Sequence, residues 1–136
     1  RDLLRFVELA GLVERPIVAH LSALDDRSCL RVLARTRKFR EHLHAVLAGA
    51  HLRRPVLQLH LDAISAAVQA AHKAQRLAPT ASPGLATQRW SSRLAADVPL
   101  HACALAGEEL LINADGRRIR KCGASDCDVY YVDTSK

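Results

Sequence analysis

Two cysteines near the end of the chain, Cys122 and Cys127, are the residues whose types and spacing point most directly to chemistry. They enclose the turn-like segment CGASDC, and the residues on either side predict two antiparallel strands, over 119–121 and 129–132. A hairpin of this kind offers two thiolates to a tetrahedral zinc ion from one loop. Because structural zinc needs two more ligands, the spacing alone leaves three readings open: half of a zinc site, a disulfide, or two unrelated thiols.

The remaining candidate ligands and nucleophiles do not complete a site in the sequence. Cys29 and Cys103 fall on expected buried helix faces, where cysteine behaves as a small apolar residue. Glu41 and His44 have the i, i+3 spacing of carboxylate-bridged metal bundles, but the second copy that such a bundle needs is missing. The sequence also lacks a nucleophile elbow, a phosphate-binding loop and an HExxH motif, so we expect the protein not to be an enzyme.

A cluster of basic residues lies just before the cysteine pair, and its members are Arg117, Arg118, Arg120 and Lys121. The chain carries a net charge of +6, which suits an anionic partner such as nucleic acid. The cluster could therefore neutralise phosphates. A solvated basic strand edge that prevents self-pairing is the alternative reading, and the sequence leaves both open.

Four segments with the helical spacing of apolar residues must position these features. We expect a short amphipathic helix that ends near Gly11, a long central helix over 27–49, a third helix over 56–75 and a fourth over 98–113. Pro16 is expected to break the chain between the first two helices, and Asp97 is placed to cap the fourth.

The long helix also carries Arg31, Arg35 and Lys38 on one face, either as a phosphate-tracking stripe or as a solvated surface.

The hydrophobic period changes from helical to alternating near Leu77, which predicts a short strand pair around residues 77 to 90 with a turn at Ser82-Pro83-Gly84. The expected fold is therefore α+β and mainly helical: four principal helices, a short β-hairpin and a C-terminal cysteine-knuckle hairpin. We expect two units, a helical α/β domain over 1–114 and the cysteine segment over 115–136.

Length and composition agree with a globular domain outside the membrane. The chain has 136 residues, of which 49% are hydrophobic and 4% aromatic, enough for one core. No apolar run approaches the roughly 18 to 20 residues of a membrane span, and no signal peptide is evident, so we expect a cytoplasmic protein. The chain begins with Arg1 rather than Met, and we expect it to be a piece of a longer protein.

The final segment, IRKCGASDCDVYYVDTSK, resembles the first half of a CGNR-type zinc finger. The segments LLRFVELAGLV, LARTRKFREHLHAVLAG and VPLHACALAGEELL are similar to the ABATE domain, which precedes this finger in bacterial stress-induced transcription regulators. In that family a Trp-Cys pair and a Cys-Gly-Asn-Arg box follow and supply the other two thiolates. The resemblance therefore places the missing ligands in a segment beyond residue 136.

The resemblance implies a regulator that binds DNA through the complete finger, with zinc held by Cys122, Cys127 and the two later ligands. This chain would then hold zinc weakly or not at all by itself. Its helical part would be a sensing or dimerising domain, with a small-molecule effector or a second copy as partner. The family signature falls on Asp133, Thr134, Ser135 and Lys136. The alternative is a small-molecule-binding or enzymatic helical domain with a structural zinc knuckle.

Overall fold

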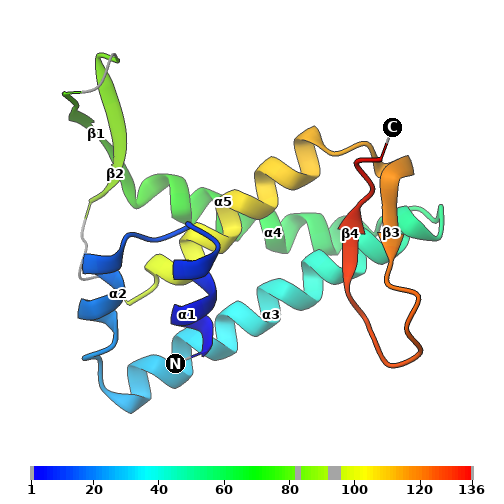
Figure 1. Cartoon of the computed structure of the whole chain (residues 1–136), viewed down its shortest axis with the longest axis horizontal. Coiled ribbons are helices and arrows are strands. Elements are labelled where there is room, and N and C mark those ends of the chain that lie inside the picture. The colour runs from blue at the N-terminus through cyan, green and yellow to red at the C-terminus, as the bar shows by residue number, and fades with distance from the viewer. Residues whose placement is uncertain (1, 82–83, 92–95, 136) are drawn as a thin grey trace.

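The computed structural model of the protein describes residues 2–81, 84–91 and 96–135. Over these ranges the chain forms five α-helices and two antiparallel hairpins, which lie at opposite ends of the molecule (Figure 1). The elements are α1 (Asp2–Leu9), α2 (Arg15–Leu21), α3 (Asp26–His51), α4 (Gln58–Lys73), β1 (Gln75–Pro79), β2 (Ala86–Trp90), α5 (Val98–Asn113), the 3-10 turn η1 (Gly116–Arg118), β3 (Ile119–Lys121) and β4 (Tyr130–Val132). The mainly helical α+β fold expected from the sequence is confirmed.

The main hydrophobic core lies where α3, α4 and α5 pack together. Its buried side chains come from all three helices, and they are Phe39, Val46, Ile64, Val68, Ala71, Leu100 and Ala104. Gly107 allows α5 to approach α3 closely, since a Cβ at this position would stand 3.1 Å from Cζ of Phe39. The apolar stripe of α3 is therefore buried against both α4 and α5.

A second core lies under the two N-terminal helices. Val7 of α1, Ile17 and Leu21 of α2 and Val98 of α5 are buried there, and Cys103 touches both cores. The sequence did not predict α2, because Pro16 was interpreted as a break. Pro16 instead stands in the first turn of α2, where the missing N–H has no intrahelical partner to lose.

Helix α3 runs through most of the molecule (Figure 1) and begins with a side-chain cap, in which Asp25 accepts a hydrogen bond of 2.9 Å from the Ser28 amide. Asp97 precedes α5 as expected, but its carboxylate makes no cap bond. It forms an ion pair of 2.6 Å with Arg35 of α3 instead. Part of the predicted basic stripe is thus committed to joining α3 and α5.

No helix in the described ranges combines the length and the apolar character needed to cross a membrane.

The hairpin of β1 and β2 projects from the end of the helical layer (Figure 1). Its register places Gln75 opposite Trp90 and Arg76 opposite Arg89, which confirms the strand pair predicted near residues 77 to 90. Ser82 and Pro83 of the predicted turn lie outside the described residues. Leu77 is 74% exposed, so this hairpin contributes little to the core apart from Trp90.

Leucine replacements at buried and at exposed helix positions are expected to differ in their effect on the free energy of unfolding. Leu100→Ala removes a side chain that is 4% exposed in the main core, and we expect it to lower the free energy of unfolding by about 2 to 5 kcal/mol. The matched variant Leu59→Ala, at a helix position that is 57% exposed, is expected to change it by less than about 0.5 kcal/mol. Urea denaturation followed by circular dichroism measures both, and equal losses would contradict the core assignment.

Candidate metal and nucleic-acid site

The two cysteines of the C-terminal hairpin meet in the loop between β3 and β4. The Cys122 amide donates to the Val129 carbonyl at 2.9 Å, and the Cys127 amide donates to the Ala124 carbonyl at 3.2 Å, which closes the loop into a knuckle. The Ala124 amide and the Cys127 thiol both donate to the Cys122 sulfur and hold the pKa of Cys122 below its ordinary value, and the Lys121 charge acts in the same direction. The knuckle therefore favours a thiolate at Cys122.

This donor set fits one half of a structural zinc site. Two sulfurs converge on one turn, and an amide that donates to a ligand sulfur is the kind of supporting bond that tunes metal sites. Within the described ranges, however, no group of three or more His, Cys, Asp or Glu side chains is placed to hold a metal ion. Cys122 and Cys127 would hold zinc only together with ligands from elsewhere.

The other two cysteines are unsuited to complete the site. Cys29 lies at the start of α3, and the hairpin lies at the far end of that helix (Figure 1). The expectation that Cys29 is buried is wrong, because α3 turns this part of its surface to solvent and Cys29 is exposed. Cys103 is half-buried between the two cores, and burial raises the pKa of its thiol.

The hairpin is packed onto α3 rather than tethered by a free linker. Ile119 of β3 is 3% exposed, and its carbonyl accepts a hydrogen bond of 3.3 Å from the His51 ring. The Tyr130 ring of β4 makes edge contacts with His44 and His51, at centroid separations of 5.0 and 5.8 Å. These two histidines stand two turns apart on one face of α3 and hold the tyrosine between them. Sequence analysis missed this contact, for which the i, i+7 spacing of the histidines was the available signal.

The segment from Asp133 to Ser135, which resembles a zinc-finger signature, closes the open end of this hairpin. The Asp133 amide donates to the Arg118 carbonyl at 2.8 Å, and its carboxylate accepts bonds from the amide and hydroxyl of Ser135, which lower its pKa. Arg118 in turn donates through Nη2 to the Ser135 carbonyl at 2.6 Å. The acid and the serine therefore form a turn that anchors β4 to η1. Thr134 lies between Asp133 and Ser135 in this turn, and Lys136 lies outside the described residues.

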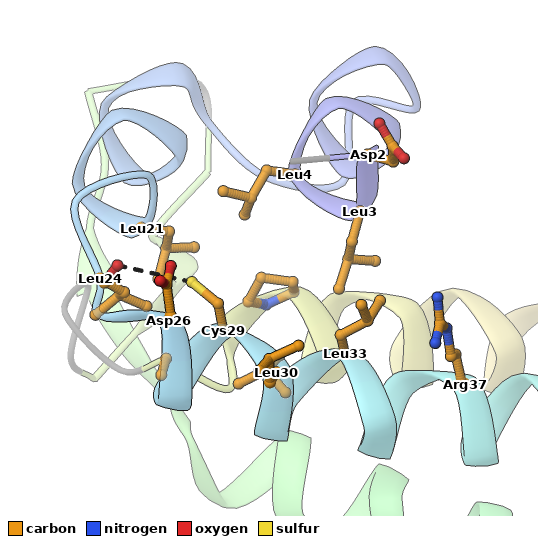
Figure 2. A pocket seen from close by; sticks show the side chains of 13 residues that line it. Asp2, Leu3, Leu4, Leu21, Leu24, Asp26, Cys29, Leu30, Leu33 and Arg37 are labelled. Atoms are coloured by element: carbon orange, nitrogen blue, oxygen red, sulfur yellow. Dashed lines mark hydrogen bonds between the residues drawn. The ribbon is translucent and has the colours of Figure 1, made fainter.

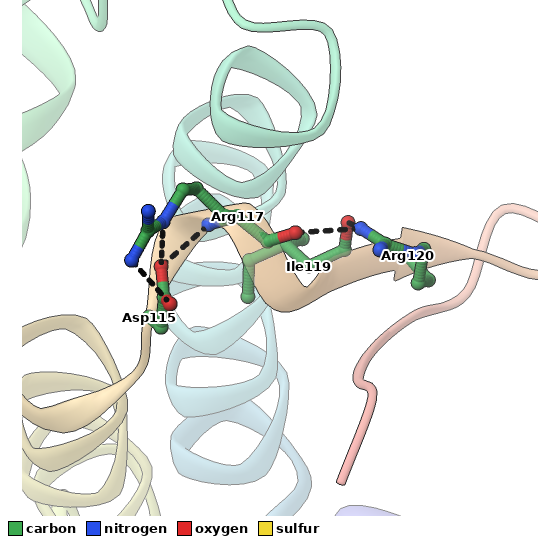
Figure 3. A network of polar contacts seen from close by, with 4 residues as sticks. All are labelled: Asp115, Arg117, Ile119 and Arg120. Carbon is green, nitrogen blue, oxygen red and sulfur yellow. Dashed lines mark hydrogen bonds and ion pairs between the residues drawn. The ribbon is translucent and has the colours of Figure 1, made fainter. Parts of the chain in front are cut away.

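The four predicted nucleic-acid-binding side chains differ in their partners: two form ion pairs with acids, and two hydrogen-bond to backbone carbonyls. Arg117 forms a two-pronged ion pair with Asp115, with Nε–Oδ1 and Nη2–Oδ2 separations of 3.2 Å (Figure 3). Lys121 pairs with Asp128 at 2.6 Å, which raises the pKa of the lysine and lowers that of the acid. Two of the four basic side chains therefore form surface ion pairs, with acids that the sequence analysis did not single out.

Arg118 and Arg120 differ from this pair because they hydrogen-bond to backbone carbonyls, although both lie close enough to the Asp133 carboxylate to help lower its pKa. Arg120 donates through Nη1 to the carbonyls of Arg117 and Ile119, at 2.7 and 3.2 Å (Figure 3), and Arg118 donates to a carbonyl as described above. A carbonyl orients a guanidinium without cancelling its charge. Neither arginine has a carboxylate at ion-pair distance among residues 2–81, 84–91 and 96–135. The structure thus orients two cationic side chains along this hairpin, Arg118 at its open end and Arg120 in β3, which leads to the cysteine knuckle.

The helical part of the chain matches a known family model. The model is named ABATE, is described as "Putative stress-induced transcription regulator", and matches residues 1–113. Since the match covers most of the chain, the chain belongs to the ABATE family. The match ends before β3, so the resemblance of the cysteine segment to a zinc finger stays a prediction. Neither the search of curated proteins nor the search of solved structures returned a match.

The zinc affinity of the knuckle is expected to depend on ligands from outside this chain. The 136-residue chain should lose zinc on dialysis against EDTA, because two thiolates leave the ion open to water and chelator. A longer chain that adds the second ligand pair should retain one zinc ion, and Cys122→Ser in that chain should release it. Zinc content by atomic absorption measures this, with Cys29→Ser as the matched control. A full, EDTA-resistant equivalent in the 136-residue chain would refute the expectation.

The metal-free knuckle is expected to oxidise in air. The two thiols lie in one loop, where Cys127 helps to lower the pKa of Cys122, and a thiolate at Cys122 is the reactive form in disulfide exchange. Aerobic storage without metal should therefore leave two of the four thiols titratable in denaturant, and a reductant should restore all four. Cys127→Ser removes the partner and should leave three. Four free thiols in the stored wild-type protein would count against the geometry.

Proposed function

We propose that this ABATE-family chain is part of a DNA-binding transcription regulator, in which residues 115–136 begin a zinc finger and the helices form its sensing or dimerising domain. The regulator acts in the bacterial cytoplasm and has no catalytic activity of its own. The observation that carries the proposal is a hairpin in which Arg118 and Arg120 have no ion-pair partner among the described residues and whose loop is suited to half of a zinc site. The family description, a stress-induced transcription regulator, supports the same reading.

The basic pair supplies affinity in this proposal, and the completed finger supplies specificity. A guanidinium that is held by a carbonyl has lost part of its rotamer freedom before it meets a phosphate, so binding costs less entropy. Phosphate contacts by themselves are blind to sequence. Base readout needs a rigid element in a groove, and zinc would provide that rigidity once all four ligands are present.

The docking of the hairpin on α3 gives the helical domain a route to the finger. Ile119 and Tyr130 fix the hairpin against the C-terminal half of α3, and the same helix packs against α4 and α5. A change in how the helices pack would therefore alter the position of Arg118 and Arg120. The proposal predicts that the two units work as one body rather than as independent modules.

The decisive experiment compares three proteins in electrophoretic mobility shifts on a pool of DNA fragments. A full-length protein with the complete finger should select specific fragments. The 136-residue chain and full-length Cys122→Ser should bind only weakly, without selection, and lose binding as salt is raised. Circular dichroism should show the helices of Cys122→Ser unchanged. Selection by the 136-residue chain, or by the cysteine variant, would remove DNA recognition from the finger and return weight to a purely ligand-binding helical domain.

The two halves of the basic cluster are expected to differ in their contribution to DNA affinity. Arg118→Ala with Arg120→Ala should reduce the slope of log K against log salt by roughly two, because each arginine accounts for one phosphate. Asp115→Ala with Arg117→Ala removes a neutral pair and should leave the slope nearly unchanged. Fluorescence anisotropy of a labelled duplex at several salt concentrations measures both. Equal reductions in the two double variants would show that the ion pairs within the hairpin do not persist in solution.

A further inference from the structure

A hollow with an apolar floor lies between α1, α3 and α5, on the side of α3 away from α4. Its volume is about 610 Å³, within the range of small-molecule sites. The floor is formed by aromatic and aliphatic side chains, chiefly Leu3, Phe6, Phe39, Leu43 and Leu110. Phe6 is 56% exposed, although a large aromatic side chain gains much from burial, so the hollow leaves a real hydrophobic surface unsatisfied.

The hollow continues along α3 into a second cavity of about 390 Å³, and the two share Leu3, Leu33 and Arg37 in their walls. Figure 2 shows this second part: Leu3 reaches down from α1 toward Leu33, and Arg37 rises from α3 beside them. Helix α1 therefore roofs a groove over α3 rather than packing flush against it.

The rim of the larger cavity carries two cations. Arg37 and Arg40 stand at i, i+3 on α3, so they lie on neighbouring positions of one helix face. Neither makes an ion pair or a side-chain hydrogen bond within the part of the chain that the structure describes. Asp2 is the acidic side chain in the wall of the larger cavity, whose rim therefore keeps a net positive charge, and Asp26 lines the smaller cavity. This contrasts with Arg35, one turn away, which is held by Asp97.

From this combination we infer that the groove binds a small amphipathic carboxylate, with an aromatic or short acyl body on the apolar floor and its carboxylate on Arg37 and Arg40. A guanidinium binds a carboxylate through paired, charge-assisted hydrogen bonds. Inorganic phosphate or a sugar phosphate would leave the apolar floor in water. A neutral apolar molecule would leave both arginines without a partner. A carboxylic acid with an apolar body would cover the apolar floor and pair with both arginines at the same time.

The inference deepens the proposed function, on which its regulatory part rests, by naming the chemical class of the effector. A ligand in the groove would bridge α1 and α3, and α3 carries the C-terminal hairpin at its other end. Filling the groove would tie the N-terminal helix to the helix that positions Arg118 and Arg120.

The test uses 2-naphthoate and its neutral analogue 2-naphthamide as probes, with isothermal titration calorimetry on the 136-residue protein. Wild-type protein should bind naphthoate in a one-to-one, saturable manner, and naphthamide at least about tenfold more weakly, because it lacks the charge that the arginines recognise. Arg37→Gln with Arg40→Gln should lower naphthoate affinity by about tenfold to a hundredfold. Arg31→Gln, an exposed arginine of the same helix outside both cavities, is the matched control and should bind as wild type.

The outcomes separate this inference from the proposed function. Circular dichroism should show all variants folded, since both arginines are exposed and glutamine is a good helix former. Amide chemical shifts should move at Phe39 and Gly107 on titration. Absence of saturable naphthoate binding, equal affinity for the amide, or unchanged affinity in the double variant would overturn the inference. So would a dimer in size-exclusion chromatography that the double variant dissociates, because the groove would then be an interface. DNA binding measured without naphthoate tests the proposed function alone.

Discussion

The burial of one long helix between its neighbours is the constraint on which the rest of the structure depends. Helix α3 places Phe39 and Val46 against α4 and α5, and Gly107 lets the crossing helix come close enough to seal that contact. This packing determines which other faces of α3 remain available for contacts with the rest of the chain. One side of its C-terminal half receives Ile119 and Tyr130, and another face opens toward the groove under α1. The main core, the docking surface of the cysteine hairpin and the groove are therefore all formed in part by α3.

The elements that could be predicted from the sequence were those with a local signal. The four principal helices are confirmed where apolar residues recur at helical spacing, and both hairpins are confirmed where strand-forming residues flank a turn. Short elements and side-chain partners were harder. Pro16 starts a helix in the protein, because proline costs nothing in a first turn, and the sequence alone does not distinguish a start from a break. Asp97 has the right type and position for a cap, yet Arg35 of another helix competes successfully for its carboxylate.

The candidate site shows the same division between local and long-range information. The convergence of Cys122 and Cys127 follows from residues within one loop, so their spacing was informative. Which side chains of the basic cluster form ion pairs could not be predicted from residue spacing. Asp115 and Asp128 lie near in sequence, but whether an acid pairs with Arg117 or with Arg118 depends on the turn geometry of η1. The contact of Tyr130 with His44 and His51 joins segments far apart in the chain. The i, i+7 spacing places the two histidines on one face of α3, but it does not identify Tyr130 as the residue that contacts them.

The hairpin at the other end of the molecule carries a charge arrangement of a different kind. Arg76 and Arg89 face each other across β1 and β2, and like charges at opposed positions weaken a strand pair. A two-stranded sheet also has backbone groups free on both outer edges, which invites further strands to add. The paired arginines discourage such addition. Salt screens the two arginines, with a Debye length of about 10 Å at 0.1 M. Rising ionic strength therefore reduces the repulsion within the hairpin, and it also reduces the repulsion that keeps further strands from adding to its edges. We therefore expect association between molecules through this hairpin to increase with ionic strength.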